Sequence, residues 1–150
     1  GGFSSVKSLA RSLIVRRQSP VAIVADADTV IPEQVEQRRR ETEEIVGNVA
    51  INTPVKVILA APTLEIIFFQ DISLLMRLLG YIPSTEMLHL AAYQPKQVLR
   101  QLISQSENFQ SQHQFVESLT ANDLEVLRQA PVIQELIQFL QSVRETAPAL

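Results

Sequence analysis

The chain has 150 residues, 46% hydrophobic and 19% charged, which is enough to bury the core of one folded domain. A formal net charge of −3 does not favour binding of nucleic acid through charge alone. The absence of cysteine excludes disulfides and thiolate metal sites. No apolar run approaches the roughly 20 residues that a membrane span needs, and no signal peptide is visible, so we expect a cytoplasmic protein that contacts no membrane.

The first part of the chain predicts a helix, a strand and a polar helix, in that order. Residues 4–17 carry apolar side chains at helical spacing. Residues 21–25 form an unbroken apolar run, which is typical of a strand buried on both faces of a parallel sheet. Residues 32–46 begin with a proline suited to a helical first turn but are almost wholly polar. We expect this segment either to lie against the domain as a helix with little burial or to be a partly mobile excursion.

A second strand and a long helix come next. Residues 54–61 repeat the buried-strand pattern, and residues 62–79 predict one helix that Gly80 closes. This helix would be apolar around most of its circumference, so we expect it at the centre of the fold. The rest of the chain is helical and glutamine-rich, with a capping box predicted at residues 120–123. Further helices are expected at residues 95–104, 114–119, 124–129 and from 131 onward.

These elements predict an α/β fold in a single domain, with an α/β part at residues 1–80 and a helical extension at residues 81–150. The strand count is low, because a two-stranded parallel sheet is not a credible independent core. Either another strand lies around residues 87–92, or the sheet is completed from outside this chain, by upstream strands or by a second copy in a homo-oligomer. Since the first residue is Gly1 and not Met, we expect a processed chain or a fragment.

Three carboxylates are predicted at one edge of the sheet. Asp26 and Asp28 follow the first strand, and Glu65 begins the helix after the second. Parallel sheets bind ligands at the carboxyl ends of their strands, and hard oxygen donors suit Mg²⁺ or Mn²⁺. The simpler alternative is that the aspartates form a turn and a cap, while Glu65 only complements the helix dipole. Lys96, at another helix start, is a candidate phosphate-binding residue or simply a solvated lysine.

Two segments carry a family resemblance. VAIVADADT and VKVILAAPTLEIIFFQD resemble the topoisomerase-primase (Toprim) domain, in the branch of the overcoming-lysogenization-defect nucleases and related small uncharacterised proteins. That branch has a strand ending in D-x-D and a second strand leading into a Pro-x-x-Glu helix start, here residues 62–65. The opening GGFSSVKSLARSLI and the tail LTANDLEVLRQAPVIQELIQFL are also similar to these proteins. This favours Gly1 and Gly2 as a native turn over a tag remnant.

The resemblance implies a Rossmann-like parallel sheet and magnesium-dependent phosphodiester chemistry on nucleic acid. It makes Asp26 and Asp28 catalytic metal ligands and Glu65 a possible ligand of a second ion. The family also uses a glutamate on an earlier strand, and no such strand precedes Gly1. We therefore expect an incomplete site and a sheet that is incomplete at its N-terminal side, with the remainder upstream in the full-length protein.

Other families share the D-x-D pattern. DADTV also matches the start of haloacid-dehalogenase-type phosphatases, in which Asp26 would be the nucleophile. Those enzymes also need a downstream lysine and an acidic motif after another strand. The sequence has no such acidic motif, and its C-terminal half is expected to be helical. Glycosyltransferases with a D-x-D are usually larger and have more strands. A catalytically inactive Toprim-like module that acts by protein contact is the remaining alternative, and the acidic charge and the missing glutamate favour it.

Overall fold

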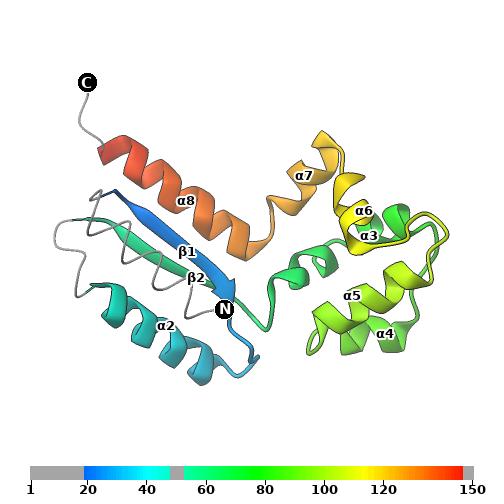
Figure 1. The fold of residues 1–150 in the computed structure, drawn as a ribbon, viewed down its shortest axis with the longest axis horizontal. Helices are drawn as coiled ribbons and strands as arrows, with labels where there is room; N and C mark the ends of the chain where they lie inside the picture. Colours follow the sequence, from blue (N-terminus) through cyan, green and yellow to red (C-terminus); the bar gives the residue numbers. More distant parts are fainter. Residues whose placement is uncertain (1–18, 48–52, 147–150) are drawn as a thin grey trace.

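The structure is a computed structural model that describes residues 19–47 and 53–146 (Figure 1). Its elements are β1 (Val21–Asp26), α2 (Pro32–Gly47), β2 (Val55–Ala60), the 3-10 helix η1 (Leu64–Phe69), α3 (Ile72–Leu79), α4 (Thr85–Leu90), α5 (Pro95–Ser104), α6 (Gln112–Glu117), α7 (Ala121–Leu127) and α8 (Pro131–Thr146). The predicted first helix at residues 4–17 lies outside the described residues, as does the glycine pair at residues 1–2. None of the described helices has the length and apolar character needed to cross a bilayer.

The sheet consists of two parallel strands. β1 and β2 pair from Val21 opposite Val55 to Asp26 opposite Ala60, and within the described residues they are the only strands. α2 packs against β2, and α8 packs on both strands. Figure 1 shows the sheet between these two helices, with both strands running toward the helical part of the molecule. The predicted α/β class is therefore confirmed, with a two-stranded parallel sheet and a helical majority.

One hydrophobic cluster belongs to the sheet and α2. It contains Ile23, Ala27, Val46, Val57 and Leu59, all buried. The polar helix α2 contributes little to it, because Val46 and Thr42 are its buried residues. The sequence left two possibilities for this segment, and the structure shows a helix that lies against the domain with little burial.

A second cluster holds η1 and α3 to α7 together. Phe115 is fully buried at its centre and contacts the rings of Phe68 and Phe109 edge to face, at centroid distances of 5.2 and 5.3 Å. The hydroxyl of Tyr81 donates to the carbonyl of Leu102 at 2.6 Å. This cluster lies beyond the carboxyl ends of the strands, and α8 then brings the chain back to the sheet (Figure 1).

The single helix predicted at residues 62–79 is wrong. The segment divides into η1 and α3, and the division falls at Asp71, whose carboxylate caps α3 by accepting from the amide of Leu74 at 3.0 Å. Apolar residues stand directly before Gln70 and directly after Asp71, so hydrophobic spacing alone did not reveal the break. Gly80 ends α3 in the left-handed conformation, with φ of 80°, as predicted.

The suggestion of a third strand at residues 87–92 is also wrong. This segment forms α4 and the turn after it, and Ser84 caps the helix by accepting from the amide of Met87 at 3.2 Å. The capping box at residues 120–123 is confirmed, because Thr120 and Asp123 each accept a hydrogen bond from the other's backbone amide. The sheet therefore gains no strand from the described helical part.

Candidate functional site

The D-x-D loop is held against the end of β2. Beyond the last paired residues, the amide of Ala27 donates to the carbonyl of Ala60, and the amide of Asp28 donates to the carbonyl of Pro62, each at 2.8 Å. The carboxyl ends of both strands therefore meet at one edge, where parallel sheets place their ligands. This edge faces the helical part of the molecule (Figure 1).

Asp26 links the end of β1 to the start of η1. Its Oδ1 accepts from the backbone amide of Leu64 at 2.7 Å. The adjacent Thr63 does not cap this helix, and its hydroxyl is buried without a partner in the described part of the chain. Asp26 therefore caps η1 in place of Thr63. This hydrogen bond uses one of its two carboxylate oxygens.

The environment of Asp26 disfavours its negative charge. Burial raises the pKa of this carboxyl above its usual range, and the Leu64 amide opposes that shift. The charges of Glu65 and Asp28 add to the rise in the pKa, whereas the charge of Lys96 lowers it. The charges of Asp28, Glu65 and Lys96 therefore all act on the carboxyl of Asp26, and a carboxyl whose pKa is shifted by burial and by nearby charges is a candidate for a functional residue.

Glu65 stands in the first turn of η1, directly after the amide that Asp26 accepts. Its Oε2 is buried and has no hydrogen-bond partner among the described residues. Burying a carboxylate oxygen without a hydrogen-bond donor raises the free energy of the folded protein. A cation or a bound donor at this position would lower that free energy.

Asp28 occupies an unusual backbone conformation, with φ of 58°. Its side chain is 65% exposed, and its Oδ2 lies 3.4 Å from Nη1 of Arg38 on α2. The same Nη1 donates to the carbonyl of Ala27. Arg38 therefore holds the D-x-D loop from outside, and Asp28 is turned toward this arginine.

Lys96 reaches this neighbourhood from a distant part of the sequence. It lies in the first turn of α5, which begins with Pro95 and packs against η1. Its charge lowers the pKa of Asp26, so the ammonium group acts at the carboxylate edge. Neither helical spacing nor a motif indicated this proximity, because it results from the packing of α5 on η1.

The oxygen atoms at this edge are of the kind that binds a divalent ion, but the described side chains are not arranged to hold one. Three carboxylates offer the hard oxygen atoms that Mg²⁺ and Mn²⁺ prefer, and the unpartnered oxygen of Glu65 is suited to one of them. Within the ranges that the structure describes, however, no three acidic or imidazole side chains are arranged to hold a metal ion as they stand. Asp28 is paired with Arg38 at 3.4 Å.

Arg38 is the residue at this site that the sequence did not reveal. It belongs to the run of three arginines on the polar helix, and the other two, Arg39 and Arg40, pair with Glu36 on the same helix. A charge run on a polar helix usually marks a solvated face. Only the packing of α2 under the sheet shows that one of the three turns toward the D-x-D loop.

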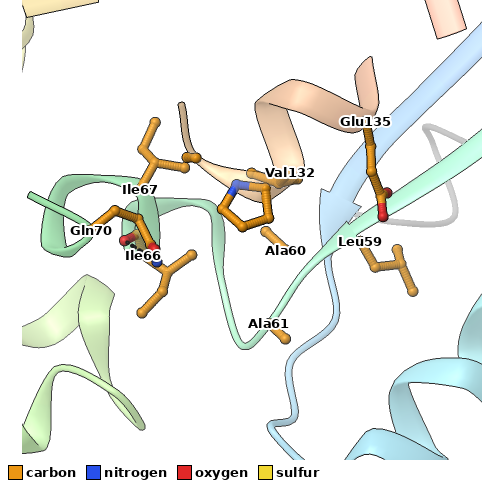
Figure 2. A pocket seen from close by; sticks show the side chains of 10 residues that line it. Leu59, Ala60, Ala61, Ile66, Ile67, Gln70, Val132 and Glu135 are labelled. Atoms are coloured by element: carbon orange, nitrogen blue, oxygen red, sulfur yellow. Dashed lines mark hydrogen bonds between the residues drawn. The ribbon is translucent and has the colours of Figure 1, made fainter. Parts of the chain in front are cut away.

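A separate pocket lies beside this edge. It has a volume of about 240 Å³ and is lined by the end of β2, by η1 and by the start of α8. Figure 2 shows a mostly apolar lining, with Gln70 and Glu135 as its polar side chains. Asp26, Asp28 and Glu65 do not line it, so the pocket and the carboxylate edge are distinct features.

Comparisons with protein-family models, with curated proteins and with solved structures found no match to this chain. The Toprim resemblance therefore depends on the motifs of the sequence alone, and function has to be argued from the residues at this edge.

Proposed function

We propose that the protein performs Mg²⁺-dependent phosphodiester chemistry on nucleic acid, on a Toprim-like fold of which this chain supplies part of the site. The observation that carries the proposal is the gathering of Asp26, Asp28 and Glu65 at the carboxyl edge of two parallel strands, with a buried and unpartnered oxygen on Glu65. The order of elements, with a D-x-D after the first strand and Pro-x-x-Glu after the second, supports the same assignment.

In this proposal Asp26 and Glu65 form the rigid side of the ion site. Asp26 is fixed by the Leu64 amide, and Glu65 is the next residue of the same helical turn. Asp28 is the adaptable ligand, because it lies on an exposed loop. When bound, the divalent ion stabilises charge on the phosphate and helps to generate the nucleophile, and Mn²⁺ can take the place of Mg²⁺.

Lys96 would contact a phosphate oxygen in the substrate. Its ammonium group acts on Asp26, so it stands close enough to the carboxylate edge to balance the charge of a bound phosphate. A lysine suits this task as a mobile point charge with several donors. The overall acidic balance of the chain means that this local cation and the metal ion, not a broad basic surface, would attract the nucleic acid.

The alternative is an inactive Toprim-like module that acts through protein contacts. The absence of an arranged group of three ligands in the described residues and the net charge of −3 favour it. A two-stranded parallel sheet is also small for an independent core, which supports completion by further strands, for example from a second copy of the chain.

The test is nicking of supercoiled plasmid DNA with Mg²⁺ by the full-length protein, which would carry the rest of the site. We expect activity that EDTA removes and that Asp26→Asn strongly reduces, because the amide keeps the hydrogen bond to Leu64 but is a poor ligand for a hard cation. Glu86→Gln, an exposed acidic residue of α4, is the matched control and should leave nicking unchanged. Equal nicking by the protein and by Asp26→Asn would reject the site and favour the interaction module.

A further inference from the structure

The pocket at the end of β2 has Glu135 as its one charged side chain among the described residues. The rest of its lining is mostly apolar, and its volume is about 240 Å³. The side-chain amide of Gln70, the other polar group, already donates to the carbonyl of Ile66 at 3.5 Å. Figure 2 shows Glu135 reaching from α8 toward the end of β2. The pocket therefore combines apolar walls with a carboxylate on one side.

A second hollow adjoins this pocket, because Glu135 lines both. It has a volume of about 280 Å³ and lies between β2 and the middle of α8. Its lining consists of Lys56 on the strand and of Glu135, Gln138, Phe139 and Ser142 on the helix. Lys56 and Glu135 therefore bring opposite charges to the same hollow, one from each element.

These two charges have no partner in the part of the chain that the structure describes. Lys56 and Glu135 are half-buried, and neither forms an ion pair or a hydrogen bond with another described residue. By contrast, Arg128 at the end of α7 pairs with Glu125 at 2.9 Å. A charge that loses part of its hydration without gaining a counter-charge raises the free energy of the folded protein. A small ligand that carries both charges would therefore satisfy both side chains at once.

We propose that the two hollows bind a free amino acid with an apolar side chain. The ammonium group of the ligand pairs with Glu135, its carboxylate pairs with Lys56, and its side chain fills the apolar pocket. An α-amino acid suits this arrangement, because its opposite charges are joined through one carbon atom and fit between two side chains that share a hollow without pairing. A cavity of about 150 Å³ is enough to hold benzene, so a leucine or phenylalanine side chain fits the pocket.

The site is separate from the carboxylate edge. Asp26, Asp28, Glu65 and Lys96 line neither of the two hollows. Binding of an amino acid therefore needs no divalent ion, and the proposal stands or falls independently of the proposed function.

The test is a titration of the unmodified protein with leucine, followed by the amide signals in NMR. Saturable shifts are expected at Ala61, Ile66 and Val132, which line the apolar pocket. Three further probes each lack one part of the ligand: isoamylamine lacks the carboxylate, isocaproate lacks the ammonium group, and glycine lacks the apolar side chain. Each should bind roughly tenfold more weakly than leucine, because each loses one of the three contacts.

Two substitutions assign the charges to their partners. Glu135→Gln should bind leucine no better than isocaproate, because the ammonium group has lost its counter-charge. Lys56→Gln should bind leucine no better than isoamylamine, for the corresponding reason at the carboxylate. Glu145→Gln removes an exposed charge from the same helix outside both linings, so it should bind leucine as the unmodified protein does.

The ranking of the four probes on the unmodified protein decides the question even if a variant fails to fold. Saturable leucine shifts at the pocket, with weaker binding of the other three probes, would support the proposal. It would be overturned by the absence of a saturable shift, by shifts confined to residues away from both hollows, or by equal affinity for leucine and glycine. Unchanged leucine affinity in folded Glu135→Gln or Lys56→Gln would overturn it as well.

Discussion

Asp26 makes one hydrogen bond that stabilises its ionised form, but its surroundings disfavour that charge. The hydrogen bond from the Leu64 amide favours its ionised form, but burial and the charges of Glu65 and Asp28 oppose ionisation more strongly. A carboxyl whose pKa rises on folding costs stability once it is ionised. Such a cost is typical of residues that are placed for function rather than for the fold.

Replacing this charge should therefore stabilise the protein. Without divalent ions, Asp26→Asn should raise the Tm by a few degrees at neutral pH, because the side-chain oxygen still accepts from Leu64 while the charge is lost. The folded pKa lies above the unfolded value of about 3.9, so the penalty is absent below that value, grows as the pH rises through the folded pKa and is complete above it. Thermal melts at neutral and acidic pH give the measurement, and a lower Tm of Asp26→Asn at neutral pH would contradict the prediction.

The pKa of Asp123 is lowered by folding, whereas that of Asp26 is raised. The side chain of Asp123 is 1% exposed and joins α7 to α3 through the amide of Thr120 and the guanidinium group of Arg77, and these bonds lower its pKa. Its contribution to stability is present above the unfolded pKa of about 3.9 and is lost as the pH falls through the lower folded value. Asp123→Asn should lower the Tm at neutral pH by several degrees, and the difference should shrink in acid. Glu125→Gln, an exposed change on the same helix, is the control and should melt like the unmodified protein.

At the scale of single elements, the end of α3 depends on a glycine. Gly80 has φ of 80°, and a Cβ there would lie 2.9 Å from Nδ2 of Asn108, which donates to the carbonyl of Leu78. Gly80→Ala should cost about 1–2 kcal/mol of unfolding free energy, because it adds a left-handed non-glycine residue and crowds that amide. Gly47→Ala is the matched control, since no atom of the described residues lies within 4 Å of its added Cβ, and it should cost no stability. Urea unfolding measures both, and equal losses would contradict the account of this cap.

The elements that the sequence predicted well are those with local signals. The two strands, the Gly80 stop and the capping box each follow from residue types within a few positions. The break between η1 and α3 was missed because apolar residues flank Gln70 and Asp71 on both sides, and the cap at Asp71 is the signal that marks it. Residues 87–92 were ambiguous because short apolar runs fit a strand or a helix, and the cap at Ser84 was the deciding signal.

The residues of the candidate site also fall into those that local sequence signals could place and those that only tertiary packing could place. The placement of Asp26, Asp28 and Glu65 at one edge follows from parallel pairing, which makes both strands end together. Lys96 and Arg38 join them through the packing of α5 on η1 and of α2 under the sheet. Contacts of this kind join helices to loops that are far from them in sequence, so no motif or spacing could indicate them.

At the scale of the whole molecule, the carboxylate edge follows the strands of one hydrophobic cluster and precedes the helices of the other along the chain. The sheet and α2 share one cluster, η1 and the helices from α3 to α7 share the other, and η1 follows directly from the sheet edge. α8 then returns to cover the sheet (Figure 1). Each cluster therefore supplies part of the site, since the D-x-D comes from the strand side and Glu65 and Lys96 come from the helical side.

The most direct test of the central claim is a titration of the protein with Mn²⁺, with binding measured by calorimetry. We expect binding that Asp26→Asn and Glu65→Gln each weaken by at least about tenfold, because loss of a ligand should cost no less than loss of an outer-shell partner. Glu86→Gln should bind as the unmodified protein does. No binding by the protein, or equal affinity in all four proteins, would contradict a metal site at the carboxyl edge of the two strands.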